Sequence, residues 1–243
     1  EGYRYHEIGI FTRGDQYDLL LETVLSDYEI PYFVDHKETV RQHPLTEWLL
    51  SALEIVQKRW NYQSMFRFLK TGLLPFPEED LDRLENYVLQ HGIQGSRWYQ
   101  ETDWGYGNEE AEDLDALNAL RRQIAVPLYA FQKAVAEPQS AEQYVRQLYQ
   151  LLETFSVPKQ LESLCQEALE LKQLEAVQVH QQVWDHVVQI FNQMTQLLQE
   201  QPLSCDAFAV LLSAAFDSLD LGLLPNGLDQ VFVGAIAHSR SRT

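Results

Sequence analysis

The chain has 243 residues, of which 45% are apolar and 22% are charged, and its formal net charge at pH 7 is -18. These values suit a globular chain with a sizeable core, in one large domain or two small ones. No window approaches the roughly 18 uncharged apolar residues of a membrane-spanning helix, and the first residues lack the order of a signal peptide, so we expect a cytoplasmic protein without membrane contact. The acidic balance disfavours an independent nucleic-acid binder, because phosphate neutralisation needs clustered Lys and Arg.

The charge is unevenly distributed along the chain. Residues 1–72 contain 8 basic and 11 acidic residues (net -3), 73–160 contain 7 and 15 (net -8), and 161–243 contain 3 and 10 (net -7). Any DNA contact is therefore expected near the first segment or at the C-terminal tip, where Arg240 lies. The chain begins without Met and stops shortly after a strand-like run, so we interpret it as a fragment.

The first 43 residues predict a small α/β unit. Residues 7–12 (EIGIFT) have the β-branched and aromatic character of a buried strand. Apolar residues then recur at three- and four-residue steps over 17–28, which predicts a helix with one apolar face, capped by Asp15. A second strand at 32–34 completes a parallel, right-handed β-α-β unit, which is incomplete alone because two strands cannot bury both faces of a sheet.

Residues 44–222 are predicted to be almost entirely helical. Helices are expected to start at Pro44, Asn61, Pro77, the capping box Ser140–Gln143 and Ser204. Helices are expected to end at Gly72, Gly92 and Gly222. Pro127 is expected to bend one helix and Pro158 to end another. The run 159–199 fits one long helix or two.

The chain ends with a further strand. A turn at 225–227 (PNG) is followed by the strand-like run 229–236, and the economical architecture returns this strand to the sheet of the first 43 residues. We therefore predict a mainly α fold with a small α/β part. Its divisions are 1–43 for the partial α/β part, 44–222 for the helical part and 223–243 for the returning strand.

The motifs of common catalytic sites are absent. There is no phosphate-binding Gly-x-x-x-x-Gly-Lys-Ser/Thr loop, and no His-Glu-x-x-His, Cys-x-x-Cys or Gly-x-Ser-x-Gly sequence. His180 and His186 lie roughly 600° apart around a helix and do not face together. Cys165 and Cys205 fit ordinary buried thiols. The acidic run 78–115 fits a metal site or a solvated surface, but no ligand spacing repeats, so we expect no catalytic residue and no metal ligand here.

The longest irregular stretch, residues 92–107, carries four glycines and two of the five Trp residues. One interpretation is a loop on which nucleic-acid bases stack, with Arg97, Trp98, Tyr99 and Trp104 as the platform. The other is a loop that its aromatic residues hold against the helical core. The acidic residues beside it favour the second interpretation.

Three stretches resemble the second motor domain of superfamily 1 helicases, in the variant of the B subunit of AddAB/RexAB-type helicase-nucleases. They are residues 8–13 (IGIFTR), the stretch from 30–35 (IPYFVD) to 56 with its continuation at 68–75 (FLKTGLLP) and 84–89 (LENYVL), and 228–234 (LDQVFVG) with Ser239 and Arg240. Residues 109–219 match only in being helical. The resemblance implies that the helical part is an insertion in an incomplete RecA-like second motor domain.

The resemblance also implies a function for the parent protein. It would be the B subunit of a bacterial ATP-dependent helicase and exodeoxyribonuclease in double-strand break repair and homologous recombination, bound to an A subunit and to DNA. The resemblance implies that the full-length subunit binds ATP with Mg and an iron-sulfur cluster. It implies no cofactor for the 243 residues of this chain. Arg13 would contact nucleotide phosphate in the intact subunit, as an arginine at a strand end can. Its alternative is a surface salt bridge with Asp15 or Asp18.

Several other residues are candidates for DNA contact. Lys37, Arg41 and His43 lie between a strand and a helix, where a phosphate backbone could pass, and the alternative is that they are ordinary loop charges. The full set of DNA-binding candidates is Lys37, Arg41, His43, Arg97, Trp98 and Arg240. For the isolated chain we expect weak DNA binding or none.

Three hypotheses about function follow. The favoured one is a non-catalytic scaffold that lines the DNA path and docks the partner subunit. The alternative is a stand-alone acidic helical module that binds a basic protein. A third is a hydrolase that uses a metal ion held by carboxylates. It would be supported if adding Mg or Mn stabilised the folded protein. The first hypothesis predicts that the strand at Val231 pairs beside an N-terminal strand, whereas the second allows the two ends to lie far apart.

Overall fold

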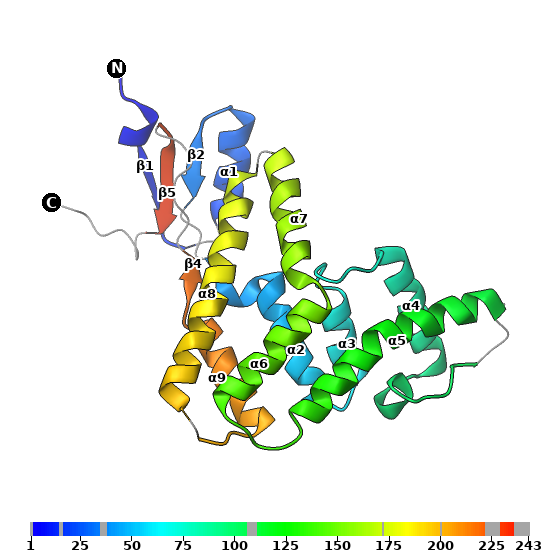
Figure 1. The fold of residues 1–243 in the computed structure, drawn as a ribbon. Coiled ribbons are helices and arrows are strands. Elements are labelled where there is room, and N and C mark those ends of the chain that lie inside the picture. Colours follow the sequence, from blue (N-terminus) through cyan, green and yellow to red (C-terminus); the bar gives the residue numbers. More distant parts are fainter. Residues whose placement is uncertain are drawn as a thin grey trace.

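The computed structural model describes residues 2–14, 17–34, 38–105, 111–171, 173–199, 201–221 and 229–235. A small parallel sheet lies at one end and a larger helical part forms the rest (Figure 1). The described helices are α1 (Asp18–Asp27), α2 (Pro44–Gln57), α3 (Tyr62–Leu69), α4 (Glu78–His91), α5 (Ala111–Ala134), α6 (Ala141–Thr154), α7 (Val157–Glu170), α8 (Leu174–Leu198) and α9 (Cys205–Asp217). The described strands are β1 (Gly9–Thr12), β2 (Tyr32–Val34), β3 (Glu38–Thr39), β4 (Asp220–Leu221) and β5 (Val231–Ala235).

Both ends of the chain contribute to one sheet. Strand β5 lies between β1 and β2 and is parallel to each, in the order β1-β5-β2 (Figure 1). Val231 N–H donates to the carbonyl of Pro31 at 2.8 Å, and Phe232 N–H to that of Ile8 at 3.1 Å. The predicted pairing of the last strand with the N-terminal strands is confirmed. The sequence did not predict that β5 would separate β1 from β2.

The sheet has a small core of its own, and much of its apolar surface is uncovered. Leu25 of α1 packs with Val34, Val231 and Val233, and Leu21 lies against this cluster. The prediction of one buried apolar face on α1 is therefore only partly right, since Leu20 is 61% exposed. The first strand is likewise not buried, with Phe11 52% exposed. The physical reason is that β1 is an edge strand and three short strands offer little surface for a helix to cover.

The helical part has a separate and much larger core, built around α2. Trp48 of α2 is fully buried. Its ring lies 4.9 Å from that of Phe68 in α3 and 6.1 Å from that of Phe155 at the end of α6. Phe68 and Phe155 are 5.6 Å apart and complete a triangle of rings. Burying large aromatic side chains in mutual contact is among the strongest contributions to a protein core, so α2, α3 and α6 form one packed unit.

A short antiparallel pair of strands stands where the chain enters and leaves the helical part. Strands β3 and β4 pair with Glu38 opposite Leu221. Val40 N–H donates to the carbonyl of Leu219 at 3.3 Å and continues the contact. Residues 183 positions apart in sequence thus lie side by side, and α2 to α9 lie between them in the chain. The predicted domain limits at 43/44 and 222/223 stay predictions.

The local helix signals predicted from the sequence are largely confirmed. Asn61 Oδ1 accepts a hydrogen bond from Ser64 N–H at 2.9 Å and so caps α3. Gly92 ends α4 with φ of 58°, a left-handed conformation that glycine adopts at little cost. Residues 159–199 form parts of two helices, α7 and α8, and α5 continues through Pro127. Predicted signals at 15, 222 and 225–227 lie outside the described residues.

Replacing Ser140 by Ala is expected to lower the free energy of unfolding by about 1 kcal/mol. Ser140 Oγ accepts from Gln143 N–H at 3.4 Å, and Gln143 Oε1 accepts from Ser140 N–H at 3.1 Å, so the predicted capping box of α6 is present. Urea denaturation measures the loss. Ser140→Asn, which can still cap, is the control, and equal losses in both variants would contradict a capping role.

Candidate functional site

Arg13 follows β1 at its carboxyl end, and its side chain is exposed. In a parallel sheet the carboxyl ends of the strands share one edge, where α/β proteins bind their ligands. Arg13 therefore has the position that the nucleotide-contact hypothesis requires. Of its alternative partners, Asp18 is buried at the start of α1 and Asp15 lies outside the described residues. The role of Arg13 stays a prediction.

Arg41, a DNA-contact candidate, is engaged with α9. Its guanidinium donates to Ser213 Oγ at 2.5 Å and lies 3.7 Å from a carboxylate oxygen of Asp217. It lines a pocket of about 430 Å³ between α2 and α9, together with Arg67. Arg67 in turn lies 2.6 Å from Glu54. Both arginines of this pocket are thus beside carboxylates, and a phosphate would have to compete with them. Lys37 lies outside the described residues.

His43, a further DNA-contact candidate, is buried with only 5% of its surface exposed. Its Nδ1 accepts from Leu45 N–H at 3.1 Å and caps α2, and its Nε2 lies 2.8 Å from His180 Nδ1 of α8. Because His43 Nδ1 is an acceptor, its proton is on Nε2, which donates to His180. Both ring nitrogens of His43 are thus engaged within the protein, which favours a structural role, and its contact with DNA stays a prediction.

Burial, and then the neighbouring His180, lower the pKa of His43 from 6.5 to about 4. The imidazole is therefore neutral at pH 7. This pair was not predicted from the sequence, where His180 was compared only with His186, because His43 and His180 are 137 positions apart, one before α2 and the other on α8. Nothing in the local pattern indicates such a contact.

The aromatic loop between α4 and α5 is packed into the core. Trp98 is fully buried, and its ring lies 5.4 Å from that of Trp104, which stacks on Tyr87 of α4 at 5.7 Å. Base stacking on Trp98 would require the loop to leave the core, so the structure favours the packed-loop interpretation. Arg97 is exposed, with its guanidinium 3.5 Å from the carbonyl oxygen of Gly92, and remains a candidate for DNA contact. Arg240 lies outside the described residues.

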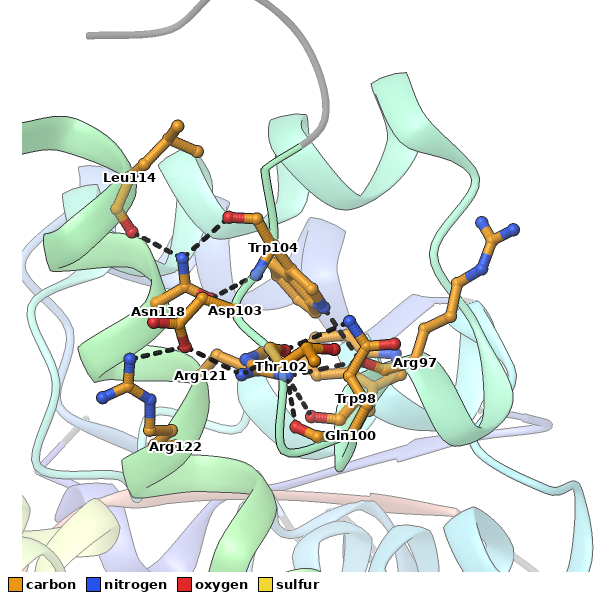
Figure 2. Close-up of polar contacts among 10 residues, drawn as sticks. All are labelled: Arg97, Trp98, Gln100, Thr102, Asp103, Trp104, Leu114, Asn118, Arg121 and Arg122. Carbon is orange, nitrogen blue, oxygen red and sulfur yellow. Dashed lines mark hydrogen bonds and ion pairs between the residues drawn. The ribbon is translucent and has the colours of Figure 1, made fainter. Parts of the chain in front are cut away.

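A buried arginine of α5 holds this loop in place (Figure 2). Arg121 is 1% exposed, and its guanidinium donates to the carbonyl oxygens of Gln100 at 3.1 Å and of Trp98 and Thr102 at 3.3 Å. The same group lies 5.1 Å from the centre of the Trp104 ring, within range of a cation-π interaction. Arg121 therefore replaces the water that these loop carbonyls would otherwise bind.

Asn118, one turn earlier in α5, fixes the end of the loop (Figure 2). Its Oδ1 accepts from Trp104 N–H at 2.8 Å, and its Nδ2 donates to the Trp104 carbonyl at 3.0 Å. The indole of Trp104 donates to the carbonyl of Arg97 at 2.8 Å. Neither Asn118 nor Arg121 was identified from the sequence. The available signal was that both occupy positions of an apolar stripe that starts at Leu114, where a polar side chain requires buried partners.

The two cysteines differ from the prediction of buried thiols, since each is only partly buried. Burial, and then Asp206, raise the pKa of Cys205 to about 11, so this thiol stays protonated and unreactive at neutral pH. Among the described residues no group of three or more His, Cys, Asp or Glu is placed to hold a metal ion. No helix in the part of the chain that the structure describes is long and apolar enough to cross a membrane.

Comparison with known proteins gives matches over nearly the whole chain, although no protein-family profile matches it. One relative is the B subunit of the ATP-dependent helicase/deoxyribonuclease of Desulforamulus reducens, 39% identical over 237 residues, or 93% of this chain and 20% of the relative. The protein of the same name from Heliobacterium modesticaldum is 37% identical over 255 residues, 99% of this chain and 21% of the relative. The protein of that name from Bacillus subtilis is 34% identical over 261 residues, which is 99% of this chain and 22% of the relative.

The class of protein to which the chain is similar is therefore that of the subunits of bacterial helicase-nucleases. Over nearly its whole length the chain matches one segment of the B subunits of the ATP-dependent helicase/deoxyribonuclease, which confirms the resemblance found in the sequence. The chain spans about a fifth of the length of the curated relatives it matches.

Proposed function

We propose that this chain is a non-catalytic scaffold in the B subunit of an ATP-dependent helicase and exodeoxyribonuclease. In this proposal it lines the DNA path and docks the A subunit during double-strand break repair and homologous recombination. The proposal is supported by the names of the relatives, which describe an ATP-dependent helicase and deoxyribonuclease. The structural observation that carries it is the parallel pairing of β5 with both β1 and β2.

The α/β part is, in this proposal, a portion of a RecA-like second motor domain. Such a domain has helices on both faces of a larger parallel sheet. The exposed apolar side chains of the sheet end support this, because Leu19 and Leu20 of α1 and Phe11 of β1 have the character of core residues without a covering layer. Further strands and helices of the subunit would cover them. The paired ends also favour an insertion over a stand-alone interaction module.

The cofactors implied for the family belong, in this proposal, to other parts of the subunit. A four-thiolate iron-sulfur cluster does not fit a chain with two cysteines, Cys165 and Cys205, on different helices. ATP with Mg needs a phosphate-binding loop, and this sequence has none. Arg13 at the end of β1 is the residue that would reach a nucleotide held elsewhere, with its guanidinium directed to phosphate oxygens.

DNA binding provides the test of this proposal. We expect the 243-residue chain to show no binding to single-stranded or duplex DNA at low salt in fluorescence anisotropy, because its net charge of -18 repels phosphate. A chain extended at both ends to include the rest of the motor domain is expected to bind. Within the extended chain, Arg41→Ala should weaken DNA binding, whereas Arg146→Ala on α6, which pairs with Glu142, is the control.

Two outcomes would contradict the proposal. Tight binding by the 243-residue chain alone would show that the charge argument fails. No binding by the extended chain, in the presence of the A subunit, would show that this segment does not belong to a DNA path. Loss of binding in both arginine variants alike would indicate a general charge effect and remove Arg41 from the candidates.

A further inference from the structure

A pocket opens between α7 and α8, on a part of the molecule to which no role has been assigned above. The two helices are joined by three residues, 171–173, and α7 packs beside the N-terminal part of the longer helix α8 (Figure 1). The pocket between them has a volume of about 510 Å³. This space is large enough for a long side chain from another protein, and its lining shows which kind of side chain fits.

The lining combines an apolar wall with two carboxylates. Leu161 from α7 and Trp184 from α8 provide the wall, and Glu162 and Asp185, one from each helix, provide the carboxylates. An arginine side chain has matching chemistry, because its methylene groups pack on apolar surface while its planar guanidinium binds carboxylates and stacks on aromatic rings. A lysine would match the charge but not the planar, forked geometry.

His180 also lines the pocket. Its Nδ1 accepts the hydrogen bond from the Nε2–H of buried His43 at 2.8 Å. Glu162 and Asp185 are the carboxylates of the lining, and no Lys or Arg is among the described residues that line the pocket.

The surrounding sequence adds a negative field. From 161 to 235 the chain has one basic residue, Lys172, against ten acidic residues. Lys159 belongs to α7 but does not line the pocket. Such an excess of one charge attracts and orients a partner of opposite charge. Charge complementarity thus points to a basic protein segment, and the same field disfavours a nucleic acid.

We propose that the pocket between α7 and α8 binds an arginine side chain of the A subunit and so forms a specific contact of the subunit interface. This inference rests on the docking role proposed above and assigns it a place and a chemistry. Glu162 and Asp185 bind the guanidinium, and Leu161 and Trp184 contact the methylene groups. The acidic residues elsewhere on α7 contribute only a general attraction.

The test compares two double variants of the intact B subunit, each of which removes two negative charges. In the first, Glu162→Gln with Asp185→Asn neutralises the pocket. In the second, Glu167→Gln with Glu170→Gln neutralises two exposed residues of α7 that do not line it. Association with the A subunit is measured by surface plasmon resonance at several salt concentrations. Circular dichroism confirms that each variant is folded.

We expect the pocket variant to weaken association by about tenfold or more, and the control variant by less than about threefold. Unchanged association in the pocket variant, with the two subunits still binding each other, would overturn this inference and leave the proposed function intact. Equal weakening in both variants would also overturn it, since only the general charge would then matter. Failure of the unmodified subunits to associate would instead contradict the proposed docking function.

Discussion

Replacing Arg121 by Met is expected to lower the free energy of unfolding by about 3 kcal/mol or more. Arg121 is 1% exposed, and its guanidinium is the donor for the carbonyls of Trp98, Gln100 and Thr102. Met fills a similar volume but donates no hydrogen bond, so the carbonyls of Trp98 and Gln100 lose the bond from Arg121, and that of Thr102 keeps only the bond from Gln100 Nε2 at 3.2 Å. The loop between α4 and α5 must then either bury unpaired oxygens or move away from the core.

The neighbouring arginine of α5 provides a matched control for this prediction. Arg122 is 52% exposed and lies 2.6 Å from Asp103, a carboxylate that also pairs with Arg121 at 3.5 Å. Arg122→Met should cost about 0.5 kcal/mol or less, because an exposed ion pair contributes little. Urea denaturation followed by the fluorescence of buried Trp98 and Trp104 measures both. Equal losses would show that Asp103, rather than the loop carbonyls, accounts for the effect of Arg121.

The stability of the protein is expected to fall between pH 6.5 and about pH 4 by about 3 kcal/mol through His43 alone. Burial holds the pKa of His43 at about 4 in the folded state, below the 6.5 of an unfolded chain. Within this interval the unfolded state therefore binds more protons than the folded state. The contribution of neutral His43 to the free energy of unfolding is therefore complete above pH 6.5 and is lost as the pH falls toward 4.

A substitution separates this effect from other acid-sensitive groups. In His43→Asn the side chain can still accept from Leu45 N–H and cap α2, but it does not titrate. We expect this variant to lose less stability than the unmodified protein between pH 7 and pH 4.5. His91→Gln, at the end of α4, is the control and should retain the full dependence. Identical pH profiles for all three proteins would show that His43 does not control acid stability.

The elements that the sequence predicted well depend on residues close together in the chain. The cap at Asn61 needs only the N–H three residues later, and the left-handed end at Gly92 needs only the absence of a side chain. The return of β5 to the N-terminal sheet was predictable for a different reason. A β-α-β unit of two strands cannot be stable alone, and residues 229–236 were the remaining strand-like run.

What the sequence did not predict depends on contacts between distant residues. Local pattern does not give the order of strands in a sheet, so the central place of β5 was not foreseen. The contact of His43 with His180 and the binding of the 98–102 carbonyls by Arg121 are likewise tertiary. For the candidate site, Arg13 was identified by resemblance and Arg41 by its position between a strand and a helix. The sequence alone does not show whether such an arginine binds a phosphate or a carboxylate.

The pairing of β3 with β4 has an evolutionary consequence. Strand β3 leads into the helical part and β4 leads out of it, and the two pair with Glu38 opposite Leu221. Because this pairing fixes both ends of the helical part, residues can be gained or lost between β3 and β4 while β1 and β5 keep their register. A change of length within the helical part would therefore leave the pairing of β5 with β1 and β2 in place.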